Sequence, residues 1–418
     1  MGKKLGIFVA EKVGLYYERR KKLIRRGKMG EKLGIAILVI CALMILNSGG
    51  SVVAQTQELK IGFTAPLSGG GMSWGYGVLA GLELAMEDYN KAGGLKVGGK
   101  TYKLKAIPYD SKYLPDPAIT AAKRLIYEDK VKIIFGEVGS AAGLAIQTIT
   151  EPNKILLFPN TYTQRLLGPD KPYTLRWFVT NVEYVGPMMA YYKKRWPESK
   201  RLAYFYPDDE TGQDMFKWEK KAGADNGIEV VGFPWERGTV DLTPIITKAL
   251  AANIDIMDCN GSPPGEAGQL INILRDMGWN KPIVRTGGSV VYDLIRICGK
   301  KANGVIYHED GDFSLPKCAA LVERFKAKKY PTLTPNAMMF PSYDGSHILF
   351  KAMQTAGTVD DTTKIRDAML NIKSYNGVSG KVHWGGKEIY GADNQLMHPV
   401  FIGEIVDEKP KVIFKIEL

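Results

Sequence analysis

The sequence predicts an α/β fold of two lobes, each built on a parallel-rich sheet with helices on both faces. After residue 54, short apolar runs alternate with stretches whose apolar residues recur at helical spacing, which is typical of parallel sheets. The 364 residues of that part are too many for one ordinary core. The alternation also runs through them in two series of similar length, which favours two lobes of similar build.

The first series opens with the apolar run Leu59–Ala65, a Gly-rich turn and a helix over Gly77–Ala92, in which Leu79, Leu82 and Met86 share one face. Such a unit places a loop at the carboxyl end of a strand, where open α/β sheets bind ligands. The same patterns predict the rest of this series, namely strands Tyr102–Asp110, Val131–Val138 and Ile155–Asn160 and helices Pro117–Asp129 and Ser140–Pro152.

The stretch Thr174–Asn181 is a candidate connection to the second series. Apolar runs predict its strands at Leu202–Pro207, Glu229–Trp235, Ile254–Cys259 and Pro282–Thr286. A further strand is expected at Gly304–Glu309, and helical spacing then predicts helices over Lys317–Lys328, Tyr343–Ala356 and Thr363–Asn371. The tail has few helices of its own and is expected to complete an earlier sheet with strands Gly380–Trp384, His398–Val406 and Val412–Glu417.

The apolar stretch Leu33–Leu46 is typical of the core of a secretion signal, because its 14 residues are too few to cross a bilayer. The small residues that follow it fit cleavage before Gln55. Met29 begins a conventional signal, so we expect translation to start there and Met1–Lys28 not to be made. A signal of this kind predicts a periplasmic or otherwise extracytoplasmic protein.

Most of the positive charge lies in the segment that the signal would remove. The whole chain has a net charge of +12, but residues 1–54 hold 11 Lys and Arg against 3 Asp and Glu, and the rest has 45 against 41. Nucleic-acid binding is therefore not expected. Three cysteines remain in the exported part. Cys298 and Cys318 could form a disulfide and leave Cys259 free, or all three could be buried thiols.

The chain carries one motif that suggests catalysis or nucleotide binding, and its context contradicts it. Gly94–Thr101 satisfies the phosphate-loop pattern G-x-x-x-x-G-K-[ST], but a predicted helix precedes it and a strand follows, the reverse of the required order. Its glycines therefore indicate a helix stop and a turn. Nucleophile-elbow spacing is absent around Ser140 and Ser262, and the four histidines show no metal spacing. No enzyme, cofactor or metal site is predicted.

The loop Gly136–Ala142 is a better candidate for a binding site. Ser140 follows a predicted strand and would cap the next helix, where free amide groups and the helix dipole also favour a ligand anion. Thr161 and Thr163 follow the neighbouring strand and would offer hydroxyl groups beside it, while Trp74 would form an apolar wall. The alternatives are that Ser140 is only a helix cap and that Trp74 is a core residue.

Five segments carry a resemblance to a known family through their order and spacing: IGFTAPLSGGGMSWG, GLELAMEDYNKAGGL, YDSKYLPDPAITAAKRLI, IIFGEVGSAAGLA and GVSGKVHW. Across Leu59–Val406 the chain resembles the extracytoplasmic solute-binding proteins of the branched-chain amino acid type, which feed ABC importers. The resemblance implies the type I periplasmic binding protein fold, with two Rossmann-like lobes, ligand in the cleft between them and three hinge crossings. The crossings would lie near Thr174–Asn181, Gly304–Phe313 and Tyr375–Lys381.

The resemblance also assigns roles to residues of the first lobe. Residues that match Ser140, Thr161 and Thr163 hold the ligand's α-carboxylate and part of its ammonium group, and an aromatic residue that matches Trp74 packs on the ligand.

The second lobe departs from the family pattern. Thr211 and Ser262 stand where tyrosines are expected, and the acid that would neutralise a ligand ammonium is replaced around residues 286–288. Asp209, Glu210 and Asp258 are candidates to substitute for it. A buried ammonium without a partner is costly, so a carboxylate without an amino group, or an amide, is an open alternative to an amino acid.

We therefore expect a monomeric solute-binding component of an ABC importer, without catalysis, that closes around a small carboxylate-bearing solute. Ser140, Thr161 and Thr163 would hold its acid end, and Trp74 and Tyr343 would flank its body. The solute could be a branched-chain or other amino acid, an aromatic or aliphatic acid, or an amide. The expected partners are the permease and ATPase subunits, and membrane contact is expected only through the permease or an uncleaved signal.

The expected lobes are residues 55–177 with 308–376 and residues 178–307 with 377–418. Two other functions are weighed against transport. A sensory ligand-binding module would act with a separate receptor, and a secreted α/β enzyme would need a nucleophile–base pair or a metal cluster that the sequence does not show.

Overall fold

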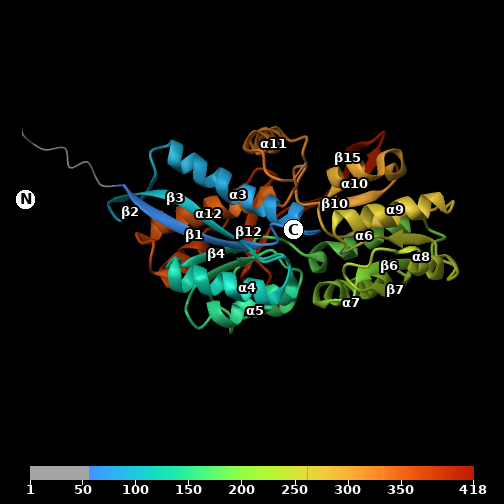
Figure 1. The fold of residues 1–418 in the computed structure, drawn as a ribbon, viewed down its shortest axis with the longest axis horizontal. Helices are drawn as coiled ribbons and strands as arrows, with labels where there is room; N and C mark the ends of the chain where they lie inside the picture. The colour runs from blue at the N-terminus through green and yellow to red at the C-terminus, as the bar shows by residue number, and fades with distance from the viewer. Residues whose placement is uncertain (1–55, 261, 333) are drawn as a thin grey trace, which may run out of the picture. The chain divides into compact units, whose positions relative to one another are not determined.

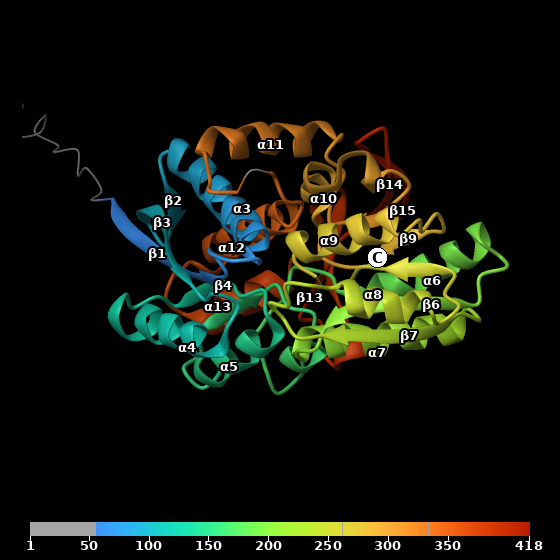
Figure 2. The ribbon, with the colours of Figure 1, turned by 45° about the vertical axis from the view of Figure 1, so that its right-hand side comes forward.

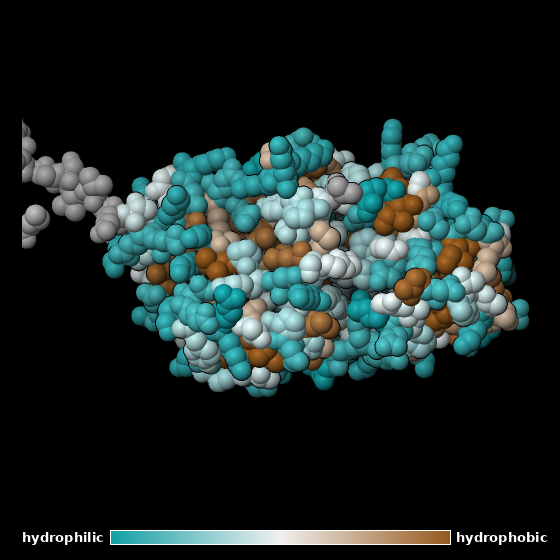
Figure 3. All heavy atoms as spheres, viewed as in Figure 1, coloured by the Kyte–Doolittle hydropathy of each residue, from teal (hydrophilic) through white to brown (hydrophobic). Residues whose placement is uncertain are grey.

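The computed structural model describes residues 56–260, 262–332 and 334–418, which belong to one compact unit. The predicted signal, its cleavage site before Gln55 and the start at Met29 lie outside this part of the chain. No helix within the described residues has the length and apolar character needed to cross a membrane. The face shown in Figure 3 is mainly hydrophilic, and its hydrophobic residues form separate small patches.

The first sheet has five strands in the order β2-β3-β1-β4-β5 (Figure 1). β1 runs parallel to β3 and β4, and β4 runs parallel to β5, whereas β2 forms an antiparallel hairpin with β3. The hairpin turn is made by Gly98 and Gly99 at positive φ. It lies inside Gly94–Thr101, so the prediction of a turn in place of a phosphate loop is confirmed. The strand bounds are Gln57–Ala65 (β1), Leu95–Val97 (β2), Lys100–Asp110 (β3), Ile133–Gly136 (β4) and Leu156–Pro159 (β5).

Helices cover both faces of the first sheet, as Figure 2 shows. Side chains alternate along β4, so Phe135 joins the apolar cluster under α3 and Ile134 joins the cluster under α4 and α5. The helices of this lobe are α3 (Met72–Lys91), α4 (Pro115–Lys123), η2 (Arg124–Glu128), α5 (Ser140–Thr150), η3 (Gln164–Leu166), α11 (Pro316–Lys328), α12 (Met339–Ala356) and α13 (Thr362–Leu370).

The second sheet has seven strands in the order β15-β14-β10-β9-β8-β6-β7. Five of these strands run parallel to one another, namely β7, β6, β8, β9 and β10. Strands β14 and β15 from the tail complete the sheet in antiparallel orientation. The strand bounds are Arg201–Pro207 (β6), Glu229–Trp235 (β7), Ile256–Asp258 (β8), Ile283–Arg285 (β9), Ile306–Glu309 (β10), Val400–Val406 (β14) and Lys409–Ile416 (β15). The helices of this lobe are α6 (Asn181–Arg195), α7 (Glu210–Asp225), α8 (Thr243–Leu250), α9 (Pro264–Asp276), α10 (Val291–Cys298) and η4 (Gly299–Ala302).

Three connections join the two lobes. The chain leaves the first sheet after β5, returns after β10 to the helices that pack on α3, and re-enters the second sheet at β14. A small antiparallel sheet precedes this last crossing, and its strands are β11 (Tyr375–Asn376), β12 (Lys381–Gly385) and β13 (Gln395–Met397). The short helix α14 (Lys387–Tyr390) lies between β12 and β13 in the sequence. The predicted α/β class with parallel-rich sheets is confirmed, and the residue boundaries of the lobes stay a prediction.

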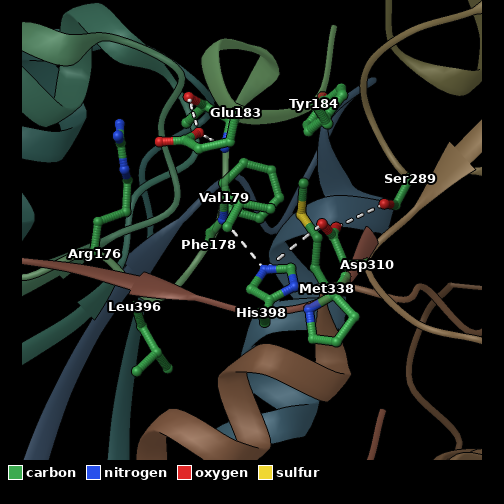
Figure 4. A network of polar contacts seen from close by, with 12 residues as sticks. Arg176, Phe178, Val179, Glu183, Tyr184, Ser289, Asp310, Met338, Leu396 and His398 are labelled. Carbon is green, nitrogen blue, oxygen red and sulfur yellow. Dashed lines mark hydrogen bonds and ion pairs between the residues drawn. The ribbon is translucent and has the colours of Figure 1, made fainter. Parts of the chain in front are cut away.

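One residue from each connection meets the others in a buried cluster between the lobes (Figure 4). The backbone N–H of Val179 donates to His398 Nε2 over 3.2 Å, and Asp310 Oδ1 lies 4.0 Å from the same nitrogen. Asp310 Oδ2 accepts a 2.7 Å hydrogen bond from the Ser289 hydroxyl. The three connections are therefore tied together at one point.

Three local predictions differ from the structure. Helix α3 begins at Met72, before the predicted start, so Trp74 lies in a helical turn and not in a loop. The reason is Gly75, where a Cβ would lie 2.0 Å from the Pro66 carbonyl oxygen, so only glycine lets α3 start this close to the end of β1.

Ser140 is the first helical residue of α5, and Gly139 is its N-cap. The prediction that Ser140 caps the helix is wrong, because a capping side chain belongs to the residue before the first turn. The disulfide alternative is also contradicted. Cys259, Cys298 and Cys318 are free buried thiols, and Cys298 packs on Gly268 while Cys318 contacts Val378 and Ser379.

Candidate functional site

A small cavity, which we call the cleft cavity, lies between the lobes. Its lining comes from segments that follow the carboxyl ends of strands in both sheets and from the start of α12, namely Trp74, Tyr113, Val138, Tyr162, Thr211, Met215, Gly288 and Met338. This edge is where open α/β sheets bind ligands. The cavity volume is about 10 Å³, which is room for about one water molecule, so the lobes are closed on each other here.

Thr211, at the start of α7, connects the lobes through its hydroxyl group. Thr211 Oγ1 accepts a 3.1 Å hydrogen bond from the backbone N–H of Ser140 and a 3.2 Å hydrogen bond from the Tyr113 hydroxyl. Both donors belong to loops of the first sheet. The first amide of α5, where the sequence predicts an anion site, therefore faces an oxygen of the second lobe.

Tyr162 makes a second connection. Its hydroxyl accepts a 3.0 Å hydrogen bond from the Gly288 N–H and lies 3.3 Å from the Tyr184 hydroxyl. Gly288 has φ +72, and a Cβ there would lie 3.2 Å from the Trp74 ring, so glycine lets the second lobe approach the tryptophan closely. The rings of Trp74, Tyr113 and Tyr162 thus form part of the walls of the cleft cavity.

Further polar contacts hold the closed arrangement at its rim. Arg165 forms an ion pair with Glu210, and the Ser73 hydroxyl donates to Asp293 over 2.7 Å. Asn336 donates to the Ser289 carbonyl over 2.6 Å. Glu210 is not among the lining residues, and its carboxylate pairs with Arg165. It therefore does not provide a negative charge for an ammonium group in the cavity.

Three predicted site residues have buried polar atoms without a hydrogen-bond partner in the described part of the chain: Ser140 Oγ, Thr161 Oγ1 and Trp74 Nε1. Thr161 packs beside the first turns of α5, since its methyl group lies next to Gly143. Buried polar atoms are normally hydrogen-bonded, and leaving one unpaired costs about 1–3 kcal/mol. These groups are available to a polar ligand.

Arg176 fixes the loop that carries Thr161 and Thr163. Its fully buried Nη1 donates to the carbonyl oxygens of both threonines, each over 2.9 Å. Its Nε donates to Gln395 over 2.6 Å and its Nη2 to the Tyr390 hydroxyl over 2.7 Å. Thr163 Oγ1 itself accepts from the Arg165 N–H over 3.4 Å, so this hydroxyl is partly used within its own loop.

Arg285 has the same positioning role in the second lobe. Its buried guanidinium donates to the carbonyl oxygens of Gly288 (3.0 Å), Cys259 (2.6 Å) and Ser262 (2.7 Å). The Ser262 hydroxyl donates to the Asn260 carbonyl over 3.2 Å. Ser262 therefore contributes to the shape of its loop and does not line the cleft cavity.

Arg237 lies beside the cleft cavity, and its Cζ is 4.5 Å from the centre of the Tyr113 ring. Its Nε donates to Asp209 Oδ2 over 2.7 Å, and Asp209 Oδ1 accepts from the Gly212 N–H over 3.0 Å. Asp209 is thus a helix cap and the partner of Arg237.

Three buried acids lie behind the cavity without lining it. Glu137 is fully buried, accepts the N–H groups of Val138 (3.1 Å) and Gly139 (3.2 Å), and has its pKa raised to about 8 by burial. Asp258 accepts from Thr286 (2.6 Å) deep in the second lobe, where burial raises its pKa to about 7 and that of its neighbour Glu219 well above the usual range. No carboxylate lines the cleft cavity.

Tyr343 lies apart from these residues. Its hydroxyl donates to Asp88 over 2.6 Å, at the far end of α3 from Trp74, and its ring packs edge-on against His347. Of the predicted site residues, Trp74 and Thr211 line the cleft cavity. Ser140, Thr161, Thr163 and Ser262 lie on segments that follow the carboxyl ends of β4, β5 and β8, and Tyr343 lies apart.

Sequence reasoning missed Tyr113, Tyr162, Met215, Gly288 and Met338 in the lining. Tyr162 lies between the two predicted threonines, and its position shortly after strand β5 could have indicated that it lines the site. Tyr113 follows β3 with φ +65, a conformation that the sequence does not reveal.

Comparison with known proteins finds a family model, curated relatives and solved structures that are similar to this chain. A family model described as periplasmic binding protein matches residues 58–410. A leucine-, isoleucine-, valine-, threonine- and alanine-binding protein of Pseudomonas aeruginosa is 24% identical over 331 residues, which cover 78% of this chain and 86% of that protein. The Leu/Ile/Val-binding protein of Escherichia coli K12 is 23% identical, with 85% and 93% covered.

Two solved structures share the fold. A leucine-binding protein from Thermotoga maritima has a TM-score of 0.74 and 22% identity, covering 86% of this chain and 99% of its own. An ABC transporter solute-binding protein from R. palustris, solved in complex with benzoate, has a TM-score of 0.73 and 18% identity, with 86% and 96% covered.

Proposed function

The chain belongs to the periplasmic binding protein family, and on this premise we propose that it is the extracytoplasmic solute-binding component of an ABC importer. The observation that carries the proposal is the cleft cavity, which lies where ligands bind in open α/β sheets and is lined by both lobes. In this role the protein would act as a monomer and deliver its solute to permease and ATPase subunits. The relatives and structural neighbours reported above are binding proteins, which supports a role without catalysis.

The polar groups around the cavity favour a carboxylate. Ser140 and Thr161 would donate their free hydroxyl groups to it, Thr163 would add a third, and the N-terminus of α5 favours negative charge. Hydrogen bonds to a charged group contribute about 1.5–3 kcal/mol each. Three such bonds and an apolar wall at Trp74 meet the roughly 8 kcal/mol that micromolar affinity requires.

The absence of an acid from the cavity lining favours a solute without an ammonium group. Asp209 is occupied by Arg237, Glu210 by Arg165, and Asp258 lies with Glu219 below the loops. An ammonium group in the cavity would lose its bound water, and no carboxylate of the described lining residues would replace that water as a partner. We infer that an aromatic or aliphatic acid, or an amide, fits this site better than a branched-chain amino acid does.

The solute would enter through an open form. A cavity of about 10 Å³ admits no organic molecule, so the lobes must separate at the three connections and close again on the solute. Thr211 would then contact the solute or move aside for its carboxylate.

A thermal-shift screen tests this function. Benzoate, 4-hydroxybenzoate, benzamide, leucine and isoleucine are added to the protein at concentrations well above an expected micromolar Kd, where a specific ligand raises the Tm. We expect an acid or the amide to stabilise more than either amino acid. Stabilisation by leucine or isoleucine alone would restore the amino-acid alternative, and no stabilisation by carboxylates, amides or amino acids would contradict the proposal.

A further inference from the structure

A second and larger cavity, which we call the hinge pocket, lies beside the connection that follows β10. Its volume is about 660 Å³, within the range of about 300–1,000 Å³ that is typical of small-molecule sites. Its walls come from α10, the end of β10, the connection that follows β10 and the start of β15, and β14 lies between β10 and β15 in the sheet. It shares no lining residue with the cleft cavity.

The hinge pocket contains a buried carboxyl group that is only partly satisfied. Glu309, the last residue of β10, is 2% exposed and lines the pocket. Its Oε1 accepts a 2.8 Å hydrogen bond from the backbone N–H of Val291, and its Oε2 has no hydrogen-bond partner in the described residues. A donor group on a ligand would satisfy that oxygen.

Aromatic rings from three segments line the same pocket as this carboxyl group. Tyr292 of α10 and Phe313 of the connection meet edge to face, with ring centres 4.8 Å apart. Tyr307 lies two residues before Glu309, so both side chains project from the same face of β10. Faces of such rings attract a cation within about 6 Å of the ring centre.

The charges of the lining favour a cation over an anion. Glu309 contributes a buried carboxyl group to the lining, and the half-buried Asp312 adds a second one, whose Oδ1 is bonded to Ser314. The remaining charged residues are exposed at the rim, where water screens them: Glu408, Lys409 and Lys411. An anionic ligand would face Glu309 at the bottom of the pocket.

We propose that the hinge pocket binds a small organic amine, whose ammonium group donates to Glu309 and whose apolar body packs on Tyr292, Tyr307 and Phe313. The proposal is independent of the solute that the cleft cavity takes.

The titration of Glu309 gives the site a signature. Burial raises its pKa to about 8, Asp310 adds to the rise, and Arg285 opposes it. The other titratable or charged groups that line the pocket are Tyr292, Tyr307, Asp312, Glu408, Lys409 and Lys411. An ammonium group favours the ionised carboxylate, so amine binding at pH 7 releases a proton, and affinity falls by up to about tenfold per pH unit below about pH 8.

Isothermal titration calorimetry with phenethylamine on the full chain tests the proposal, with phenethyl alcohol as the neutral analogue. We expect saturable binding of the amine, none of the alcohol, and a loss of about tenfold or more in Glu309→Gln, which keeps the size of the side chain. Glu198→Gln, exposed and outside the pocket lining, is the matched control and keeps the affinity. Tyr292→Ala removes one wall, leaves the buried carboxyl in place and weakens binding as well.

Four results would overturn the proposal. They are no saturable binding of phenethylamine up to millimolar concentration, equal binding of the alcohol, an unchanged affinity in a folded Glu309→Gln protein, and loss of amine binding in Trp74→Ala with Glu309 intact. The last result would place the amine in the cleft cavity. Circular dichroism shows whether each variant is folded.

Discussion

The backbone N–H of Ser140 donates a 3.1 Å hydrogen bond to Thr211 Oγ1, which joins the first turn of α5 in one lobe to the first turn of α7 in the other. Tyr113 donates to the same oxygen over 3.2 Å. A single hydroxyl group thus accepts from two loops across the interface. The closed arrangement of the lobes depends on this group more than on the Arg165–Glu210 ion pair at the rim, because that pair is partly exposed and contributes little.

Substitution of Thr211 by Val removes that acceptor and keeps the shape of the side chain. Two hydrogen bonds of about 0.5–1.5 kcal/mol each are lost, so the closed form becomes less populated and its affinity for solute falls several-fold. The radius of gyration from solution X-ray scattering is expected to increase. Ser262→Ala is the control, since the Ser262 hydroxyl bonds only within its own loop. A closed form that is equally compact in Thr211→Val would contradict this role.

Ser140→Ala and Thr161→Val separate binding from stability. Both hydroxyl groups are buried without a partner in the described residues, so their removal costs the free protein little stability. Each would remove a hydrogen bond to the solute carboxylate, worth about 1.5–3 kcal/mol, and lower the affinity at least about tenfold. Calorimetric titration and thermal melting measure the two effects. A lower Tm with unchanged affinity would assign these residues to the core.

Arg176→Met tests the positioning of the threonine loop. The substitution leaves the carbonyl oxygens of Thr161 and Thr163 unpaired, together with Gln395 and Tyr390. At about 1–3 kcal/mol for each buried group, the free energy of unfolding falls by about 3 kcal/mol or more. Urea denaturation measures the loss. Lys326→Met is the control, because Lys326 pairs with Glu323 at the exposed surface and its loss is expected to cost less than about 1 kcal/mol. Equal losses in the two variants would contradict the role of Arg176.

The strand and helix pattern could be predicted because it is local. Strands buried on both faces, such as β4 and β5, consist of continuous apolar runs, and helices such as α11 show helical spacing. The start of α3 was missed because it depends on the contact of Gly75 with Pro66, which only the folded chain shows.

The candidate site was predicted where it depends on one strand–loop–helix unit and missed where it depends on the partner lobe. Ser140 and Thr161 could be named from their places after β4 and β5. Arg176 and Arg285 could not be named from the sequence, because arginine is usually exposed. Both are buried, and their guanidinium groups donate to carbonyl oxygens from separate loops. Tyr343 was expected to flank the body of the solute, and its hydroxyl instead donates to Asp88 of α3.

The Asp310 carboxyl gives a pH-dependent stability of definite sign. Burial raises its folded-state pKa to about 7, above the unfolded value of about 3.9. Between these values the folded protein holds a proton that the unfolded chain lacks, so the contribution of Asp310 is full below about pH 4 and is lost as pH rises to about 7. In Asp310→Asn this loss is absent.

The stability of Asp310→Asn relative to the wild type is therefore expected to rise by up to about 1.4 kcal/mol per pH unit across that window. Urea denaturation of both proteins from pH 4.5 to 8 measures the difference. His398, whose pKa burial lowers to about 4, contributes equally to both curves and cancels. Parallel stability curves for the two proteins would contradict the burial of a titrating group at this crossing.

Mass spectrometry of the small molecules released by denaturing the purified protein tests the central claim most directly. We expect one carboxylate-bearing compound in a nearly equimolar amount, and we expect it to be absent from a folded Ser140→Ala/Thr161→Val double variant. Retention of the same compound by that variant, or a retained compound without a carboxylate or amide group, would contradict the account.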